Sequence, residues 1–590
     1  MNLPELAPQA RDAPRTGAGR ASSPLSGPHL PSASVSASPF TIDALGGKGL
    51  FLRHALALGC PVPPGFHVPR EEPFDRASLD EALVELEAKT GLQIGDEKAP
   101  LCVSVRSSPR VSQPGKLPTI LNLGCTPKSL DALTVRLGSR RAALDTYARS
   151  LRARVALLHG AQEQRATRAS RGASQVDAQA LEAEIKTLEE SLGAPQDARE
   201  TIASVIETLA KKTGEALVVQ AMVYGNGANS GAGVAHSRDP ISGVSRLFGE
   251  VVWERQGDDL SQGRASGVSI TKLAAGRRAE ESFEARQPKA FHSLQTQLAN
   301  LERSFDACVE VEWTCESGVL HILQVRPSTL SPRAEVVLAV TWAQEGRTTQ
   351  EGALMRVDPL AVAQASSFEV VRDLAPILGR GLAASPGAAM GVVAIEVDDA
   401  LARAARGERV ILIRSDANPE DAPAVRAAVG VATAAGGLTS HAAVMSRALR
   451  RPCAVSVSNL RIDRNVVHVE GASQSTLRPG DVVTVDGTTG TLYAGAARLA
   501  SRAESEASKT LAGWAIEAKT VRLLLAPDGL PNAEERAQSL GADGIASSAL
   551  PTWEDASQPF PDAPEVIVLG ELVHAARVAA ARLELAQRAW

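Results

Sequence analysis

The hydrophobic and polar positions along the chain predict two regions of mixed helix and strand, joined by a helical segment. In the first region, a helical pattern opens at Gly46-Gly47-Lys48-Gly49 and ends before a Pro-rich turn that leads into a strand near Phe66. Residues 128–212 are rich in Ala, Leu, Glu, Arg and Lys, which predicts long helices with a polar break at 163–175. Apolar runs predict strands at 101–106, 216–224, 231–237, 245–252, 309–314 and 319–325.

The second region, residues 381–496, is predicted to be a compact β-rich domain with a few helices. One helix is expected after Ser440, and turn signals such as Asp486-Gly487 separate short Val/Ile-rich strands. The flanking segments 335–380 and 497–512 are predicted to be a helical linker and a polar linker. The strands of the domain are expected at 391–396, 409–413, 429–433, 453–457 and 481–485, and a final strand, helix, strand and helix at 519–525, 532–540, 565–569 and 571–588.

Length and charge agree with a multidomain α/β protein. At roughly 150 residues per domain, a chain of 590 residues corresponds to about four domains. The 62 Lys and Arg residues against 67 Asp and Glu give a formal net charge of -5, which excludes a generally basic nucleic-acid-binding chain. Aromatic residues make up only 3%, which argues against a base-stacking surface. We therefore expect no nucleic-acid partner.

Cysteine usage and hydropathy indicate the compartment. The six cysteines form no C-x-x-C pair, so neither a zinc ribbon nor a disulfide framework is predicted, and a reducing cytosol fits. No segment has the composition of a membrane-spanning helix, and no apolar secretory core is present near the start. Residues 1–37, rich in Ala, Pro, Ser, Gly and Arg, are predicted to be a disordered tail. We expect a cytoplasmic protein without a membrane partner, organellar import through that tail being the lesser alternative.

The sharpest candidate chemistry lies in residues 436–443, Gly-Gly-Leu-Thr-Ser-His-Ala-Ala. Two glycines permit a tight turn and close backbone approach, and Thr439 or Ser440 can cap the helix that follows. His441 then lies in the first helical turn, where free N–H groups and the helix dipole favour an anion. A neutral imidazole nitrogen at this place can attack a phosphoryl group. The apolar face of the same helix also suits a core histidine, which is the alternative.

Residues 433–457 resemble the phosphohistidine signature of pyruvate, phosphate dikinase and phosphoenolpyruvate synthase. The runs 411–414, 418–421, 479–481 and 486–490 resemble the same domain. This resemblance implies a swivelling phosphohistidine domain at 381–496 with His441 as the phosphocarrier. In some dikinases the threonine two residues before the histidine is a regulatory phosphorylation site. Thr439 matches that position, and capping of the helix is its alternative role.

Two pairs of polar residues alternate on neighbouring predicted strands. Glu310 and Glu312 share one strand face, where two carboxylates suit a phosphate-bound Mg²⁺. Gln324 and Arg326 repeat this spacing on the next strand. Surface charges on a sheet are the plainer alternative for all four.

The stretches 46–66, 103–124, 219–249 and 310–326 resemble the nucleotide-binding domain of the dikinases, an ATP-grasp fold. The resemblance implies that residues 38–334, with a helical insert at about 128–212, bind ATP as substrate. Lys48 and Arg106 would contact its phosphates, Gln324 and Arg326 would act in the nucleotide chemistry, and Glu310 and Glu312 would hold Mg²⁺. Residues 256–259, Gln-Gly-Asp-Asp, also resemble the family.

Two departures from the family pattern bear on activity. The loop 112–119 contains Lys-Leu-Pro where dikinases usually have small residues or Met and then an acid, which leaves both inorganic phosphate and water open as co-substrates. In the family a (β/α)8 barrel that binds phosphoenolpyruvate and pyruvate follows the swivelling domain. Only residues 514–545 resemble its first strand and helix, and Ala549 stands where the family has an arginine. We therefore expect residues 513–590 to be a truncated, barrel-like segment with open sheet edges.

These observations lead to one hypothesis and two alternatives. The hypothesis is an α/β multidomain phosphotransferase that forms a phosphohistidine on His441 from ATP with release of AMP, with hinges at the two linkers. The pyruvate/phosphoenolpyruvate half-reaction would be absent or supplied by another chain. The first alternative is a non-catalytic nucleotide-binding paralogue that regulates or scaffolds a full-length dikinase. The second is a split enzyme with the barrel on a separate chain. A barrel subunit and a homodimer are the macromolecular partners left open.

Overall fold

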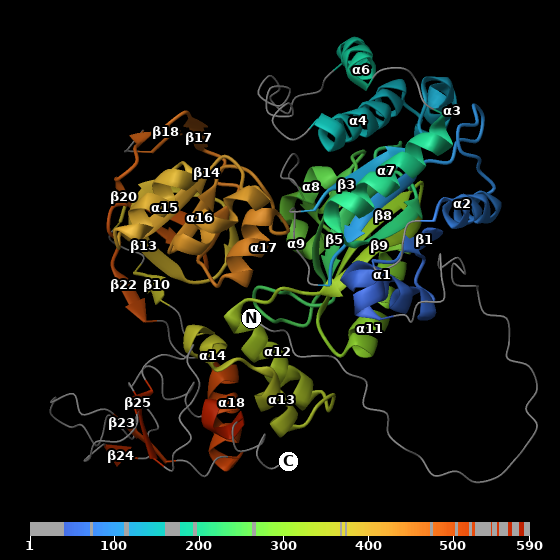
Figure 1. Ribbon diagram of the computed structural model, residues 1–590. Helices are drawn as coiled ribbons and strands as arrows, with labels where there is room; N and C mark the ends of the chain where they lie inside the picture. Colours follow the sequence, from blue (N-terminus) through green and yellow to red (C-terminus); the bar gives the residue numbers. More distant parts are fainter. Residues whose placement is uncertain are drawn as a thin grey trace, which may run out of the picture.

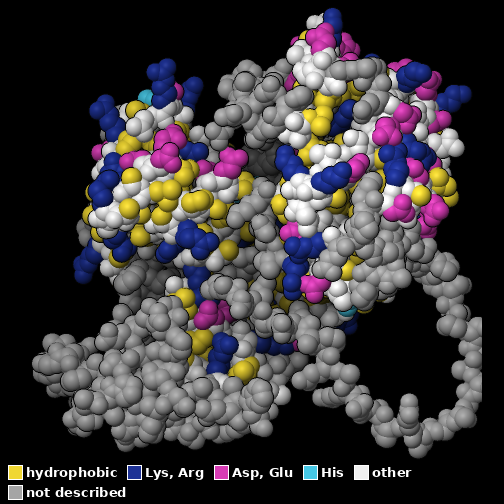
Figure 2. Space-filling view, viewed as in Figure 1, with side chains coloured by type: hydrophobic (Ala, Val, Ile, Leu, Met, Phe, Trp, Pro, Cys, Tyr) yellow, Lys and Arg dark blue, Asp and Glu magenta, His cyan; other side chains and the backbone are white. Residues whose placement is uncertain are grey.

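The structure is a computed structural model in which two α/β domains lie next to each other above a group of helices (Figure 1). The mixed α/β class predicted from the sequence is confirmed. Acidic and basic side chains alternate over the visible face of both domains, in keeping with their near-equal numbers (Figure 2). The structure describes residues 41–70, 75–110, 117–159, 177–192, 197–261, 267–365, 368–371, 375–472, 476–501, 505–518, 522–525, 544–545, 552–553, 565–568 and 578–582.

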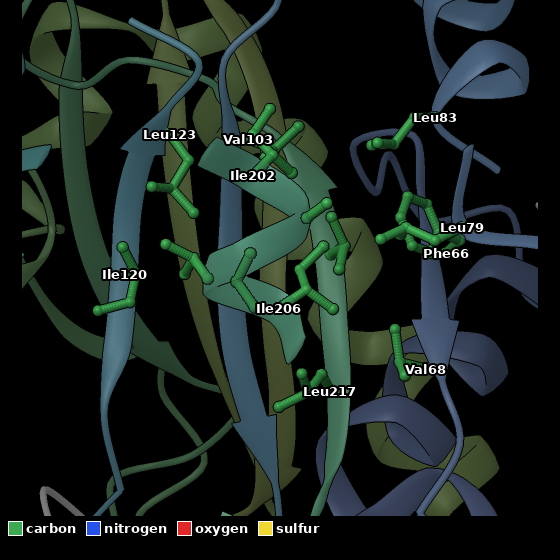
Figure 3. Packing of buried hydrophobic residues seen from close by; sticks show 14 of the residues in the cluster. Phe66, Val68, Leu79, Leu83, Val103, Ile120, Leu123, Ile202, Ile206 and Leu217 are labelled. Atoms are coloured by element: carbon green, nitrogen blue, oxygen red, sulfur yellow. The ribbon is translucent and has the colours of Figure 1, made fainter. Parts of the chain in front are cut away.

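The first domain contains two antiparallel sheets, and helices cover the first of them on one face. Ile202 and Ile206 of α7 (Ala198–Thr213) pack against the strand residues Val103, Leu123 and Leu217 (Figure 3). Beside α7, helix α2 (Arg76–Thr90) packs on the same core. In spatial order the strands of this sheet are β1 (Gly65–Val68), β4 (Ala216–Ala221), β2 (Val103–Ser108) and β3 (Thr119–Leu123).

In the second sheet, alternation of side chains separates an apolar face from a polar one. Val309, Val311 and Trp313 pack under α11 (Pro288–Phe305), so Glu310 and Glu312 point to the opposite face. In spatial order the strands are β7 (Val268–Ser269), β6 (Phe248–Trp253), β5 (Gly231–His236), β8 (Val309–Glu316) and β9 (Val319–Pro327). Short helices lie between these strands in the chain: α8 (Asp258–Ser261), α9 (Lys272–Ala275) and α10 (Phe283–Arg286). Leu260 of α8 packs on Val234 and Val252.

Helix α1 (Ile42–Ala57) connects the two sheets and carries the predicted glycine turn. It is kinked at Gly46, where φ is 65° and a Cβ would lie 1.6 Å from the carbonyl oxygen of Ser108, so only glycine fits. The Ser108 hydroxyl donates to the Leu45 carbonyl at 2.7 Å and accepts from the Gly49 N–H at 3.0 Å. These bonds hold the turn around Lys48 against the end of β2.

The Ala- and Leu-rich stretch forms helices, as the sequence predicts. They are α3 (Leu130–Leu137), α4 (Arg140–His159), α6 (Ala178–Leu192) and α7. Helices α4 and α6 share a core that contains Leu144, Tyr147 and Leu151 of α4 with Leu181 and Ile185 of α6. The polar break predicted at 163–175 and the tail 1–37 lie outside the described residues.

The second domain is built on an eight-stranded mixed sheet with parallel central strands. The sequence predicted a few helices there and placed one of them after Ser440, and the structure has α15 (Val397–Ala405), α16 (Ala422–Ala427) and α17 (His441–Ala448). In spatial order the strands are β11 (Ile377–Arg380), β21 (Thr491–Ala494), β20 (Val482–Asp486), β13 (Ala388–Ala394), β14 (Val410–Arg414), β15 (Gly430–Thr433), β16 (Cys453–Val455) and β12 (Leu382–Ser385). A small sheet of β17 (Leu460–Asp463), β18 (Val466–Val469) and β19 (Thr476–Leu477) completes the domain.

Two chain segments connect this domain to the rest of the molecule, and they pair with each other. Strands β10 (Phe368–Val370) and β22 (Leu499–Ser501) form an antiparallel ribbon. Before β10 come the helices α12 (Pro332–Gln344), α13 (Gln350–Arg356) and α14 (Pro359–Ala365). Residues 497–512 are not wholly a linker as predicted, because α18 (Glu506–Ala518) begins within them and buries Leu511 and Ala515 against α12 and α13.

The C-terminal region contains four parallel strands whose order is not that of a barrel. In space they follow the order β24 (Gly544–Ile545), β23 (Arg522–Leu525), β26 (Glu565–Val568) and β25 (Thr552–Trp553). A (β/α)8 barrel places each strand beside the next in sequence. The predicted barrel-like arrangement is therefore not confirmed, and Ala549 and the helix expected at 532–540 lie outside the described residues. No helix within the described ranges is both long and apolar enough to cross a bilayer.

Candidate functional site

The polar face of the second sheet carries two rows of side chains that cross its strands. In the first row, His236 of β5 lies opposite Glu310 of β8, which lies opposite Arg326 of β9. In the second row, two residues along each strand, Glu312 lies opposite Gln324. The strand register thus brings together four of the residues that the sequence singled out.

Lys48 and Arg106 reach the same place from the glycine turn and from the first sheet. Burial lowers the pKa of Lys48 to about 8, the Arg106 charge adds to this effect, and the Glu312 carboxylate opposes it. Arg106 is 8% exposed and donates through Nη2 to the Leu323 carbonyl of β9 at 2.6 Å and to the Gln220 side chain. Arg106 therefore joins the two sheets and leaves its remaining nitrogens near Glu312.

The two glutamates of β8 differ in their surroundings. Glu310 is 3% exposed and accepts a hydrogen bond from Arg326 Nε at 2.8 Å. Although burial opposes it, the Arg326 charge holds the pKa of Glu310 below its ordinary value. Within the part of the chain that the structure describes, Glu312 forms no hydrogen bond or ion pair, and it interacts electrostatically with Lys48 and with Arg326. The two predicted metal ligands therefore differ: Arg326 binds the Glu310 carboxylate, whereas the Glu312 carboxylate lies near the positive charges of Lys48 and Arg326 without a hydrogen bond to either.

The residues present fit a Mg²⁺ ion that is shared with a phosphate, rather than a complete protein cage. Among the described residues, no group of three or more His, Cys, Asp or Glu side chains is arranged to hold a metal ion. Mg²⁺ commonly uses one or two carboxylates together with substrate phosphates and water. Glu312 supplies such an oxygen, whereas Glu310 is already occupied by Arg326.

His441 is the first residue of α17 and faces this polar sheet across the contact between the domains. Helix α17 lies on the side of the second domain that faces the first (Figure 1). Burial lowers the pKa of His441, the Arg326 charge adds to it, and the Glu312 charge opposes it. The imidazole is therefore neutral near pH 7, which leaves a nitrogen lone pair free to act as a nucleophile.

A buried contact between Glu250 and Thr439 holds the domains in this arrangement. The Thr439 N–H and hydroxyl donate to Glu250 Oε2 at 3.2 and 2.8 Å. The carboxylate lies so close to Gly437 that a Cβ there would be 2.4 Å from Oε2. Burial raises the pKa of Glu250, although the hydrogen bonds from Thr439 oppose this. The alternative role of Thr439 as a helix cap is wrong, because Ser440 occupies the N-cap position and the Thr439 side chain bonds Glu250.

Further residues that the sequence reasoning missed support this site. Arg447 of α17 is 1% exposed, and its Nη1 donates to the carbonyls of Ala384 and Leu438 at 3.0 Å each, which fixes the loop before His441. His236 is also 1% exposed, and burial lowers its pKa to about 4. A polar residue within a buried strand pattern was the available signal for Glu250 and His236.

The segment Gln256-Gly257-Asp258-Asp259 contacts the helical insert. Arg149 of α4 donates to Asp258 and to Asp259 at 2.9 Å, and its Nε donates to Asp145 at 2.7 Å. Gln256 lies against Asn122 at the end of β3. The loop predicted to handle phosphate, 112–119, lies outside the described residues up to position 116.

Most of the chain is similar in sequence to known proteins. Residues 406–490 match the family described as "PEP-utilising enzyme, mobile domain". The pyruvate, phosphate dikinase of Rhizobium meliloti (strain 1021) is 32% identical over 557 residues, which cover 85% of this chain and 61% of the relative. The proteins of that name from Clostridium symbiosum and Entamoeba histolytica are 30% and 32% identical over the same 85% share. The matches support the resemblance to this family, and the chain spans about three fifths of the length of these curated relatives.

Proposed function

We propose that this chain is an ATP-dependent phosphotransferase of the pyruvate, phosphate dikinase type that forms a phosphohistidine on His441. The observation that carries the proposal is that the Glu250–Thr439 contact holds the start of α17 against the polar face of the second sheet, where Arg326 and Glu312 lie close enough to His441 to act on its charge. A histidine placed at a helix start only to fill a core would have no reason to face an arginine and a carboxylate. The printed name of the relatives and the mobile-domain match support the same reaction class.

The proposed role of each residue of the site follows from the charge of its side chain. Lys48, Arg106 and Arg326 bind and orient the polyphosphate of ATP and offset the charge that develops on its oxygens. Gln324, opposite Glu312 on the sheet, adds an amide to the same face. Mg²⁺, held through Glu312, would bridge phosphate oxygens and neutralise their charge. Glu310 is assigned to Arg326 rather than to the metal, since it accepts the Arg326 hydrogen bond.

Transfer from ATP to His441 breaks two bonds of the polyphosphate. An imidazole nitrogen of His441 attacks the β-phosphorus of ATP, and the bond between that phosphorus and the oxygen that bridges it to the α-phosphate breaks, so that this oxygen leaves with AMP. The γ-phosphoryl group passes to water or to inorganic phosphate, giving phosphate or pyrophosphate. The enzyme keeps one phosphoryl group on His441, beside the free N–H groups at the start of α17, which favour an anion.

A second site must then accept the phosphoryl group, so the second domain has to leave the first. The ribbon of β10 and β22 is the proposed hinge. We propose that the pyruvate/phosphoenolpyruvate half-reaction is absent from this chain or supplied by another, which the strand order of residues 522–568 supports. Modification of Thr439 would place a phosphate dianion against Glu250, so the proposed regulatory phosphorylation would oppose docking by charge repulsion.

The test is labelling of the full chain with ATP that carries radiolabelled β-phosphate, in the presence of Mg²⁺. We expect acid-labile, alkali-stable label on the protein together with AMP, and we expect its loss in His441→Ala. His468→Ala is the matched control, since His468 is an exposed histidine of the same domain. Label that survives His441→Ala unchanged would contradict the assignment. Tight ATP binding without any label in the wild-type protein would instead favour the non-catalytic paralogue.

A further inference from the structure

Behind the Glu310–Arg326 pair lies a buried row of polar side chains that the proposed reaction does not use. His236 Nδ1 lies 2.9 Å from Ser328 Oγ, and Ser328 Oγ lies 3.3 Å from Cys308 Sγ. On its other side, His236 Nε2 lies 3.8 Å from Glu310 Oε2. The row therefore runs from a thiol through a hydroxyl and an imidazole to the carboxylate that holds Arg326.

The Cys308 thiol has two acceptors within reach, Ser328 Oγ at 3.3 Å and the Arg238 carbonyl at 3.7 Å, and donation over the shorter distance sets the other directions in the row. The Cys308 thiol is 3% exposed, and its hydrogen can be donated to Ser328 Oγ. The Ser328 hydroxyl then has its own hydrogen left to donate, and the acceptor within reach is His236 Nδ1. A neutral imidazole carries one proton, so an accepting Nδ1 places that proton on Nε2. The Nε2–H is the atom that faces Glu310.

We infer that His236 is a positioning residue, held by Ser328 as the Nε2–H tautomer, which keeps Glu310 turned to Arg326. Arg326 donates a hydrogen bond to Oε1 of the Glu310 carboxylate, and His236 faces Oε2 of the same carboxylate. Nε2 lies beyond hydrogen-bond distance of Oε2 and has no hydrogen-bond partner among the described residues, so its N–H attracts the Glu310 carboxylate by electrostatics alone. This attraction opposes a swing of Glu310 to the metal beside Glu312 and keeps the Arg326 guanidinium directed at the phosphates and His441. The inference rests on the proposed function for the role of Arg326.

A packing role is the rival explanation, and side-chain replacements separate the two. His236 also packs edge-on against Phe248, with ring centroids 5.7 Å apart, so His236→Phe keeps an aromatic ring in this place. His236→Gln puts an N–H donor near the position of Nε2, and His236→Asn puts a polar group near that of Nδ1. If His236 only fills space, His236→Phe will cause the smallest loss of His441 labelling. If His236 positions Glu310, His236→Gln will cause the smallest loss.

The first measurement is single-turnover labelling of His441 at saturating ATP, together with ATP affinity by calorimetry. We expect His236→Gln to stay within about threefold of wild type in both, because it keeps a donor for a charged acceptor. We expect His236→Phe and His236→Asn to lose about tenfold or more, with melting temperatures close to wild type for the Phe variant. His468→Phe, at an exposed site, controls for the loss of a histidine. Equal behaviour of the Gln and Phe variants would overturn the inference.

The second measurement does not depend on phosphoryl transfer and so separates failure of this inference from failure of the proposed function. The ¹⁵N spectrum of histidine-labelled full-length protein, with His236 assigned by its loss in His236→Gln, reports the tautomer directly. We expect Nε2–H in the wild type and a mixture of tautomers in Ser328→Ala, which removes the donor to Nδ1. An Nδ1–H tautomer in the wild type would refute the inference even if His441 is labelled. An Nε2–H tautomer with unlabelled His441 would uphold the geometry while the reaction fails.

Discussion

Replacing Thr439 by valine removes one hydroxyl from the contact between the two domains and changes little else. The Thr439 hydroxyl donates to Glu250 Oε2 at 2.8 Å, in a place where the Glu250 side chain is 6% exposed. Valine keeps the shape and the backbone N–H that donates at 3.2 Å. The substitution therefore tests the strength of docking with the fold of each domain unchanged.

The magnitude follows from the charge of the acceptor. A hydrogen bond to a charged group contributes about 1.5–3 kcal/mol, and each 1.4 kcal/mol changes an equilibrium about tenfold. Thr439→Val should therefore lower the ratio of docked to undocked protein by about ten- to a hundredfold. Glu250→Gln removes the charge from the same contact, so the double variant should show a smaller loss than the two single losses combined, because both variants break one interaction.

Two assays read this change. Single-turnover labelling of His441 with ATP and Mg²⁺ should slow in proportion to the loss of docked protein. Energy transfer between dyes on cysteines introduced at the exposed positions Lys289 and Asn465, one in each domain, should fall as the domains separate. The matched control is Glu254→Gln, which replaces an exposed acid four positions after Glu250. Wild-type labelling and wild-type energy transfer in Thr439→Val and in Glu250→Gln would refute docking through this contact.

Three further changes test other parts of the second domain. Gly437→Ala should slow His441 labelling at least tenfold at an unchanged melting temperature, because the added Cβ would lie 2.4 Å from Glu250 Oε2; wild-type labelling would contradict the close approach. Burial raises the pKa of Asp416 from 3.8 to about 6, so its contribution to stability is complete below pH 4 and is lost as the pH rises through 6, by up to about 3 kcal/mol. Asp416→Asn should remove the fall in thermal stability that the wild type shows between about pH 4 and 6, and an unchanged pH profile would contradict this. Arg447→Met should destabilise the second domain by about 1–3 kcal/mol in chemical unfolding, since two buried carbonyls lose their donor, whereas Arg461→Met at an exposed site should not.

Local patterns in the sequence were enough to predict the placement of candidate residues that depend only on neighbours in the same element. Spacing by two predicted that Glu310 and Glu312 share a strand face, and the glycine run before His441 predicted a helix start. Both predictions depend only on the periodicity of one strand or one helix. The strong helical patterns of residues 128–212 were visible for the same reason.

Residues that act across elements could not be found this way. Glu250 looks like a single acid in a buried strand, and its role appears only when Thr439, 189 positions later, lies against it. The division of labour between Glu310 and Glu312 depends on the register of β8 with β9, which places Arg326 opposite Glu310. Helix α18 was missed because its burial depends on α12 and α13, which are distant in sequence. Tertiary pairing of this kind leaves no local periodicity.

The pairing of β10 with β22 restricts the movement that we propose for the second domain. The two strands pair in antiparallel register, with Phe368 opposite Ser501 and Val370 opposite Leu499, so they bend and twist together. A single flexible linker would allow the domain to rotate in all directions, whereas a two-stranded ribbon restricts its rotation to one plane. Along an arc, His441 returns to the same few places, and its effective concentration at each of them stays high. The length of one strand cannot change alone without breaking these pairs, so an insertion in one connection calls for a matching insertion in the other.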